Sequence, residues 1–276
     1  MNAPADVVDE RQSLCVFAPS PLLTVTVEHD VHESDQLHVH VGGQGIWIAR
    51  MVRTLGMRPQ LCAVFGGETG QLTRFLAELE DLDVRHVRTE AWNGGYVHDR
   101  RGGDRVELID VPPSPLSRHE LDELYSVTMA AALSTRTCIL AGSHVKEVIP
   151  DDVYARLSSD LRSAGVEVIA DLSGSSLRAV LEGGRALVKV SDEELERDGW
   201  ADSRDEPAVL HAIDRLQSAG AKGVVVSRGA ETTLASIGGF LFGVGAPEVR
   251  VVDSRGGGDS MTGALGVASA RAMPTL

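Results

Sequence analysis

Short apolar runs rich in β-branched residues alternate with longer amphipathic segments along most of the chain. Runs that are apolar throughout are typical of strands buried on both faces, and the segments between them have the helical period. The pattern therefore predicts an α/β fold, a mostly parallel sheet with helices on both faces. The predicted strands are 14–18, 60–65, 137–142, 166–171, 186–190 and 223–227. The predicted helices are 45–55, 69–79, 118–133, 151–164, 206–219 and 258–271.

Two stretches, 23–41 and 84–111, alternate between apolar and polar residues with the period of a half-exposed strand. The Gly102–Gly103 pair inside the second stretch suits a tight hairpin turn. We expect the two stretches to form a small antiparallel sheet that acts as a lid or a dimer surface; a pair of hairpins without function is the alternative. The predicted organisation is one domain over 12–276 that carries this lid, preceded by a disordered tail over 1–11.

Composition excludes several classes of protein. The 276 residues are 43% apolar and 24% charged, which is typical of a globular chain. The 26 basic and 40 acidic residues give a net charge of −14, which disfavours contact with nucleic acid or an anionic membrane. Aromatic residues make up only 4% of the chain, so stacking platforms for bases or glycans are not expected.

The cysteines and the N-terminus indicate the compartment. Cys15, Cys62 and Cys138 each lie in an apolar run and form no CxxC motif, which predicts buried thiols in a reducing compartment. The first twelve residues are acidic and polar, unlike a signal or transit peptide, and no apolar run approaches the roughly 20 residues that span a bilayer. We therefore expect a cytoplasmic protein without a membrane partner.

A glycine-rich segment near the C-terminus, 251–270, is the strongest candidate for chemistry. Gly256, Gly257 and Gly258 precede Asp259 and an apolar helical pattern. Glycines at a helix N-terminus let backbone N–H groups converge on an anion such as a transferring phosphoryl group. Asp259, in the first turn, could take a proton from an attacking hydroxyl. The alternative is a flexible loop in which Asp259 only caps the helix.

A second pair of glycine-rich segments, 41–56 and 64–72, also precedes helices, so a ligand could approach the backbone there. The GxGxxG dinucleotide motif fails because Ile48 occupies its last glycine position, and no GxxxxGK[ST] motif is present. A serine hydrolase is excluded by Thr262, which stands where GxSxG needs its last glycine. His38 and His40 share a strand face, but they lack a third ligand at metal-binding spacing, so exposed strand histidines are expected instead.

In this order and at this separation, the two glycine segments resemble the ribokinase/PfkB family of sugar kinases, and most closely its 1-phosphofructokinase and tagatose-6-phosphate kinase branch. The C-terminal motif D-T-x-G-A-G-D-S is matched by Asp253, Ser254, Gly256, Gly257, Gly258, Asp259 and Ser260. The N-terminal motif G-G-K-G-x-N-x-A is matched by Gly42, Gly43, Gly45 and Ala49. Three shorter matches lie between them: LAGS at 140–143, Asp171-Leu-Ser-Gly, and VSRG at 226–229. KVSDEEL at 189–195 is similar to the family's KPNxEEL.

The resemblance implies a ribokinase-like three-layer α/β/α domain with a β lid, a homodimer through that lid, and ATP with Mg²⁺ as cofactors. It implies that Asp259 is the catalytic base and that Gly256, Gly257 and Gly258 form the anion hole. Glu194 would contact the metal through water. The residues implied on the nucleotide side are Lys189, Ser191, Glu194, Ser227, Gly229 and Ser254.

The departures from the family pattern lie on the substrate side. The sugar-binding Asp is Leu22, the Lys of GGKG is Gln44, and the following Asn is Trp47. Gly94 stands where the lid carries a phosphate-binding Arg, and Ser191 replaces the Asn of KPN. Charge-assisted hydrogen bonds of this kind contribute roughly 1.5–3 kcal/mol each, so a sugar phosphate is disfavoured. The positions implied on the substrate side are Leu22, Gly42, Gly43, Gln44, Trp47, Gly94 and Asp110.

The sequence thus predicts an ATP-dependent kinase that phosphorylates a hydroxyl of a sugar or related small molecule. The net charge of −14 opposes the approach of anionic ligands, so it favours a neutral acceptor over a phosphorylated one. Attraction for ATP must then be local, from backbone N–H groups, Mg²⁺, Lys189 and Arg255. A kinase-fold protein that binds nucleotide or metabolite with little or no turnover is the alternative. A nucleoside kinase, with Trp47 stacked on a base, is a third hypothesis.

Overall fold

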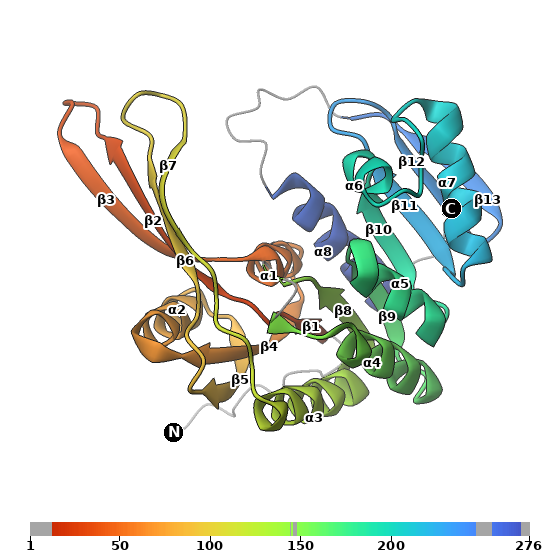
Figure 1. Ribbon diagram of the computed structural model, residues 1–276, viewed down its shortest axis with the longest axis horizontal. Coiled ribbons are helices and arrows are strands. Elements are labelled where there is room, and N and C mark those ends of the chain that lie inside the picture. Colours follow the sequence, from red (N-terminus) through yellow and green to blue (C-terminus); the bar gives the residue numbers. More distant parts are fainter. Residues whose placement is uncertain (1–12, 144, 146–147, 247–255, 272–276) are drawn as a thin grey trace, which may run out of the picture.

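The computed structural model describes residues 13–143, 145, 148–246 and 256–271, and it contains a large and a small sheet (Figure 1). The large sheet has the strand order β13-β12-β11-β10-β9-β8-β1-β4-β5, and neighbouring strands from β11 to β5 are all parallel. β12 and β13 add an antiparallel edge. The bounds are β1 Ser13–Phe17, β4 Arg58–Gly66, β5 Asp83–Thr89, β8 Thr137–Ala141, β9 Glu167–Asp171, β10 Leu187–Ser191, β11 Gly223–Ser227, β12 Thr233–Ile237 and β13 Phe240–Val244.

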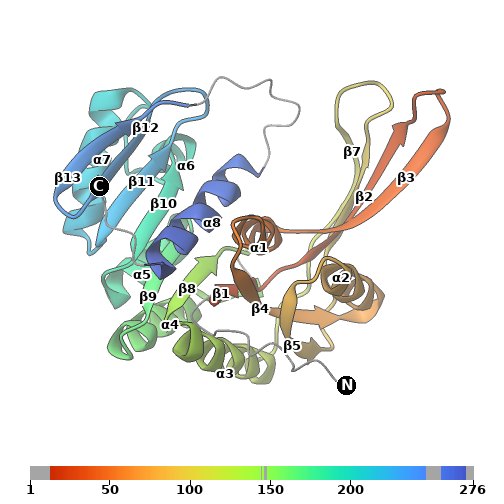
Figure 2. The same cartoon turned by 180° about the vertical axis from the view of Figure 1, so that it is seen from behind.

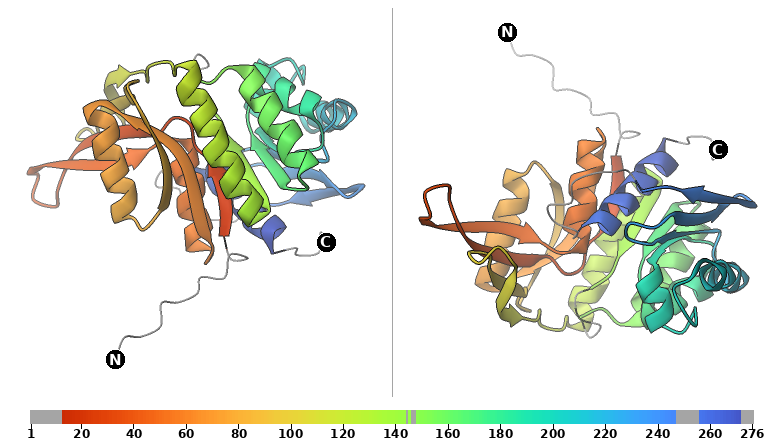
Figure 3. Two further views of the ribbon diagram at one scale, coloured as in Figure 1. Left: turned by 90° about the horizontal axis from the view of Figure 1, so that it is seen from below. Right: turned by 90° about the horizontal axis from the view of Figure 1, so that it is seen from above.

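Helices cover both faces of the large sheet, each over its own buried cluster. Figure 3 shows α3 and α4 on one side and α8 on the other, and Figure 2 shows α1 and α8 side by side. The six predicted strands and six predicted helices are confirmed to within about two residues at each end. The helix bounds are α1 Gln44–Thr54, α2 Gly67–Leu79, α3 Arg118–Thr135, α4 Asp151–Ser163, α5 Gly174–Gly183, α6 Asp192–Arg197, α7 Glu206–Ser218 and α8 Gly257–Ala270.

The small sheet has the order β3-β2-β6-β7, formed by β2 Leu22–His29, β3 Asp35–Gly42, β6 Gly95–Asp99 and β7 Val106–Val111. Its outer pairs are antiparallel as expected, but the central pair, β2 and β6, is parallel. The predicted lid segment 84–111 was too long, since β5 belongs to the edge of the large sheet beside β4. β5 alternates because it is an edge strand: Val87 and Thr89 are buried, whereas Arg85 and Arg88 are not. The predicted turn at Gly102–Gly103 joins β6 to β7, and Gly103 has a φ of 89°.

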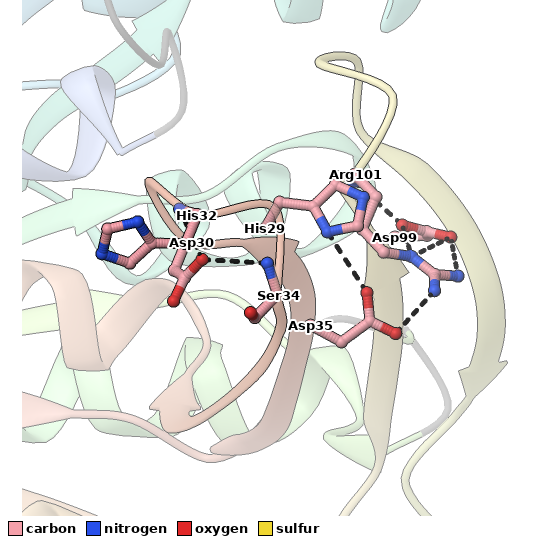
Figure 4. Close-up of polar contacts among 7 residues, drawn as sticks. All are labelled: His29, Asp30, His32, Ser34, Asp35, Asp99 and Arg101. Atoms are coloured by element: carbon pink, nitrogen blue, oxygen red, sulfur yellow. Dashed lines mark hydrogen bonds and ion pairs between the residues drawn. The ribbon is translucent and has the colours of Figure 1, made fainter.

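Charged side chains tie the two hairpin tips of the small sheet together (Figure 4). The Arg101 guanidinium donates to the carboxylates of Asp99, at 2.8 Å, and Asp35, at 3.1 Å, and it holds the pKa of Asp99 down at about 2. His29 Nδ1 lies 3.2 Å from Asp35. These contacts join β2–β3 to β6–β7, so the hairpins form one sheet up to their tips.

The described part of the chain holds no group of three Asp, Glu, His or Cys side chains placed to ligate a metal. His38 instead contacts Gln36 and Glu28, both at 3.2 Å. None of the described helices is both long and apolar enough to cross a bilayer. The predicted tail over 1–11 lies outside the described residues.

Candidate active site

The candidate site lies where α8 begins, beside the carboxyl ends of the central parallel strands, the usual ligand position in open α/β sheets (Figure 1). Gly256 is the N-cap of α8 and has a φ of 76°, a left-handed conformation that favours glycine. The Ser260 amide donates to the Gly256 carbonyl at 2.8 Å, which closes the first turn. The N–H groups of that turn have no partner within the helix and concentrate its positive end.

Asp259 occupies the first turn of α8, as predicted. Burial and the nearby Asp171 carboxylate raise the pKa of Asp259 to about 6, with a further contribution from Glu194, while Lys189 acts in the opposite direction. A carboxylate with a pKa near neutrality is suited to general base chemistry.

A buried ion pair lies beneath this turn and joins two strands to α8. Asp171, at the end of β9, is 2% exposed, and Lys189, on β10, is 5% exposed. Their side chains approach to 3.4 Å, and the Thr262 hydroxyl donates to the other Asp171 oxygen at 2.5 Å. Burial raises the pKa of Asp171, although Lys189 and Thr262 oppose the shift. We call Gly256–Asp259 with Asp171, Lys189 and Thr262 the α8 mouth.

Sequence reasoning did not assign a role to Thr262. It lies three residues after Asp259, which places both on one face of the helix. That pattern was a usable signal. Nothing in the sequence, however, showed that the hydroxyl would meet Asp171, 91 residues away.

Two predicted nucleotide-side residues, Ser191 and Glu194, form the capping box of α6. The Glu194 amide donates to Ser191 Oγ at 3.2 Å, and Glu194 Oε2 accepts from the Ser191 amide at 2.9 Å. The cap orients Glu194, whose charge contributes to the raised pKa of both Asp171 and Asp259. α6 therefore brings Glu194 close to the α8 mouth.

The remaining predicted nucleotide-side residues follow β11 or precede α8. Ser227 ends β11, and Gly229 has a φ of 59° with no described atom within 4 Å of where a Cβ would stand, so it borders open space. Ser254 lies outside the described residues.

The residues predicted to hold substrate, which we call the acceptor side, are mostly packed against protein. Leu22 is 3% exposed. Asp110 is the exception, since it lies opposite Tyr96 on β7, a strand that is exposed along its length. A Cβ at Gly42 would lie 2.5 Å from Thr24 Oγ1, and one at Gly43 would lie 2.8 Å from the Ser20 carbonyl. The glycines at these positions are therefore explained by close approach of protein atoms.

Gly94 has the least room on the acceptor side. A Cβ there would lie 2.5 Å from the Val111 carbonyl and 2.7 Å from the Pro113 nitrogen. No larger side chain fits without movement of that backbone, so the phosphate-binding arginine of the family pattern has no space here.

Gln44 and Trp47 connect the acceptor side to the rest of the site. Gln44 Oε1 accepts from the Gly142 amide at 2.6 Å and so ties the start of α1 to the end of β8. The Trp47 indole is 40% exposed and lies beside Gly256, 3.6 Å from where a Cβ would be. The Arg50 guanidinium lies 4.4 Å from the indole centroid and is held by Glu80. Trp47 is thus the predicted substrate residue that reaches the α8 mouth.

The model of one protein family, pfkB family carbohydrate kinase, matches residues 18–275. A point mutant of phosphofructokinase-2 from Escherichia coli is 24% identical, with a TM-score of 0.83 over 94% of this chain and 87% of that chain. Arabidopsis thaliana ribokinase, complexed with ribose and ATP, is 20% identical, with a TM-score of 0.70 over 94% and 86%. These two structures confirm the predicted ribokinase-like fold.

Proposed function

The chain belongs to the pfkB family of carbohydrate kinases, and on that premise we propose that it transfers a phosphoryl group from ATP to a hydroxyl of a sugar or related small molecule. The observation that carries the proposal is the α8 mouth, where a carboxylate with a pKa of about 6 adjoins N–H groups that have no acceptor within the helix, at its positive end. A base and an anion site side by side are what phosphoryl transfer to a hydroxyl requires.

In the proposed reaction, Asp259 accepts the proton of the acceptor hydroxyl. The N–H groups of Gly256, Gly257 and Gly258 orient and stabilise the oxygens of the transferred group. MgATP supplies that group and the cation that offsets its charge. The helix dipole of α8 acts on the same atoms without reorganisation, because its N–H groups are fixed by the first turn.

The residues present fit ATP and Mg²⁺. Gly229 and Gly257 border open space, and Gly257 keeps a backbone donor at the start of α8. Among the described residues no three-carboxylate cage is present, and Glu194 keeps Oε1 outside its cap. Mg²⁺ commonly retains waters and binds substrate phosphates, so Glu194 would hold it through water. Lys189, Ser191, Ser227, Gly229 and Ser254 complete the proposed nucleotide side.

The acceptor would lie between the α8 mouth and the small sheet, against Trp47. Related structures support a sugar: phosphofructokinase-2 from E. coli was solved with fructose-6-phosphate, and Arabidopsis ribokinase with ribose. Gly42, Gly43 and Gln44 would shape the floor of this pocket, with Leu22, Gly94 and Asp110 around it. An uncharged sugar suits this side best, because Gly94 leaves no room for a cationic side chain.

The same acceptor side favours a second candidate function, a kinase-fold protein that binds nucleotide with little turnover. Leu22 is buried and Gly94 is enclosed by backbone, so neither offers a polar group to a sugar. Activity measurements discriminate between the two functions.

The small sheet also supports the proposed homodimer. Along β3 and β7, apolar residues alternate with polar ones, and those on one face remain exposed: Leu37, Val39, Ile109 and Val111. Exposed apolar patches of this kind mark interaction sites, and we propose that a second copy covers this one. The three free, buried cysteines suit a reducing compartment such as the cytoplasm.

The test is a screen of ATP consumption against neutral sugars, sugar phosphates and nucleosides with the wild-type chain and Asp259→Asn. We expect turnover with at least one neutral sugar and a loss of about 10³-fold or more in kcat in the variant, with nucleotide binding retained. Nucleotide binding without turnover on any acceptor would favour the silent kinase-fold protein. Turnover unchanged in Asp259→Asn would contradict the assigned base.

A further inference from the structure

β13, Phe240–Val244, forms one edge of the large sheet, at the end of the molecule opposite the small sheet (Figure 1). In the part of the chain that the structure describes, no strand pairs with its outer side. Phe240, Leu241 and Val244 are each more than half exposed. An edge strand presents unpaired backbone N–H and C=O groups, so an apolar edge is a template for a further strand. β13 is therefore a candidate interaction surface.

The charge content of β13 sets it apart from the other edge strands. The other three described edge strands, β5, β3 and β7, all carry charged residues: Asp83, Arg85, Arg88, Asp35, Glu107 and Asp110. Charges on an edge strand discourage pairing with another chain. Residues 232–246, which include β12 and β13, contain neither a charged residue nor a histidine. The edge at β13 thus lacks the protection that the other three edges have.

The turn between β12 and β13 determines which backbone groups of β13 face outward. Gly238 and Gly239 have φ values of 62° and 84°, as in a type I′ two-residue hairpin, so the pair of residues that flanks the turn is hydrogen-bonded. Hydrogen-bonded and non-hydrogen-bonded pairs alternate along an antiparallel ladder. Every second residue of β13, starting with Phe240, therefore directs its N–H and C=O groups toward β12. Leu241 and Gly243 direct theirs outward.

This pattern makes β13 complementary to itself when two copies pair antiparallel about a two-fold axis at Phe242. Leu241 of one copy then lies opposite Gly243 of the second copy, so the outward N–H and C=O groups of these residues bond to each other. The leucine side chain meets a residue without a side chain, which leaves it room. On the other face Phe242 lies opposite its own symmetry mate, flanked by Phe240 and Val244. The rings of Phe240 and Phe242 already lie 6.4 Å apart within one copy.

Charge favours a second copy of the chain as the occupant of this edge. Each chain has a net charge of −14, so two copies repel each other over most of their surfaces. The uncharged hairpin is a place where two copies approach without bringing like charges together. A two-fold dimer also pairs both free edges at once and leaves neither of them open to further strands.

We propose that two copies of the chain associate through β13, which joins their large sheets into one continuous sheet across a two-fold axis. This surface is separate from the proposed dimer surface on the small sheet, which lies at the other end of the molecule (Figure 1). The inference does not rest on the proposed function. Because the paired surface is small, the dissociation constant is expected to be on the order of 1–100 μM.

The test measures molecular mass by analytical ultracentrifugation over concentrations that bracket this constant. Every chain carries Val39→Lys, so that the small sheet does not contribute to association. The variants are Phe242→Lys and Phe242→Glu, each of which places like charges directly opposite one another across the axis. Phe240→Lys, at a more exposed position of the strand, is the second site, and Phe75→Lys on the exposed surface of α2 is the matched control. Thermal melts verify folding.

The Val39→Lys chain and its Phe75→Lys control should dimerise alike. Adding Phe242→Lys or Phe242→Glu should weaken dimerisation at least about tenfold. An equimolar mixture of these two variants should restore it, because opposite charges then face each other across the axis. A Val39→Lys chain that stays monomeric throughout the concentration range would overturn the proposal. So would dimerisation that persists unchanged in the Phe242 variants and in Phe240→Lys.

Discussion

The α8 mouth and the acceptor side are both rich in glycine, but the glycines serve opposite purposes. At the α8 mouth and nucleotide side, Gly257 and Gly229 border open space, and Gly258 gives room to a lysine ammonium. On the acceptor side, the space beside Gly42, Gly43 and Gly94 is filled by other parts of the chain. A glycine-rich segment therefore indicates close approach of something to the backbone, and only the structure tells whether that is a ligand or protein.

The two regions also differ in what could perform chemistry. The α8 mouth relies on backbone N–H groups and three buried or half-buried charges. The acceptor side offers Trp47, a half-exposed aromatic side chain next to Gly256. The proposed phosphoryl transfer is thus built into the fold, whereas acceptor choice depends on a few side chains.

The largest effect on stability is expected from Gly94→Ala. The new Cβ would collide with the backbone at Val111 and Pro113, and overpacking against backbone should lower the free energy of unfolding by about 2–3 kcal/mol. Denaturant melts measure this change. The folded fraction of the variant should keep the nucleotide affinity of wild type. Gly102→Ala, where a Cβ meets no described atom within 4 Å, serves as the control. Unchanged stability in Gly94→Ala would remove the packing explanation for this glycine.

Gly258→Ala should lower kcat more than it lowers stability, the reverse of what is expected for Gly94→Ala. Its Cβ meets the flexible end of Lys189, so the ammonium can shift, and the free energy of unfolding should fall by less than about 1 kcal/mol. Displacing that charge should nevertheless lower kcat roughly tenfold or more. Steady-state kinetics and melts on the same preparation separate the two quantities. A variant that loses stability but keeps kcat would show that Gly258 serves packing, as the acceptor-side glycines do.

A change in stability smaller than that of Gly94→Ala, and of opposite sign, is expected at Asp259. Its pKa of about 6 exceeds the unfolded value of 3.8, so its carboxylate destabilises the fold as pH rises through that interval. At pH 7.5 the Asp259→Asn variant should be about 1–2 kcal/mol more stable than wild type, allowing for partial exposure, and the gain should vanish near pH 4. Urea melts at both pH values measure it. Asp214→Asn, at an exposed position of α7, should show no such gain.

The sequence was sufficient to predict those strands and helices whose type follows from the residue pattern within the segment itself. Parallel strands such as β8 and β11 are apolar throughout because both faces are covered. β5 was misassigned because an edge strand alternates just as a strand of the small sheet does. α6, six residues long, and the β12–β13 hairpin were not predicted, since neither has a long periodic pattern.

At the site, the glycines and Asp259 are contiguous in the chain, and so a motif could predict them. The Asp171–Lys189–Thr262 cluster joins β9, β10 and α8, and its distances depend on strand register and helix packing. On the acceptor side, the enclosure of Gly94 by Val111 and Pro113 depends on how the connection after β7 returns to the large sheet. Contacts between such distant segments cannot be predicted from the spacing of residues along the sequence.

The central claim, that Asp259 is a base held near neutrality by burial and by Asp171, is tested most directly by the pH dependence of kcat/KM for a neutral sugar acceptor. Since the base must be ionised, kcat/KM should be constant above about pH 7 and fall through an acid limb near pH 6. At pH 5 the loss should be about tenfold. A profile that stays flat down to pH 5, for a chain shown by melts to remain folded there, would contradict the account.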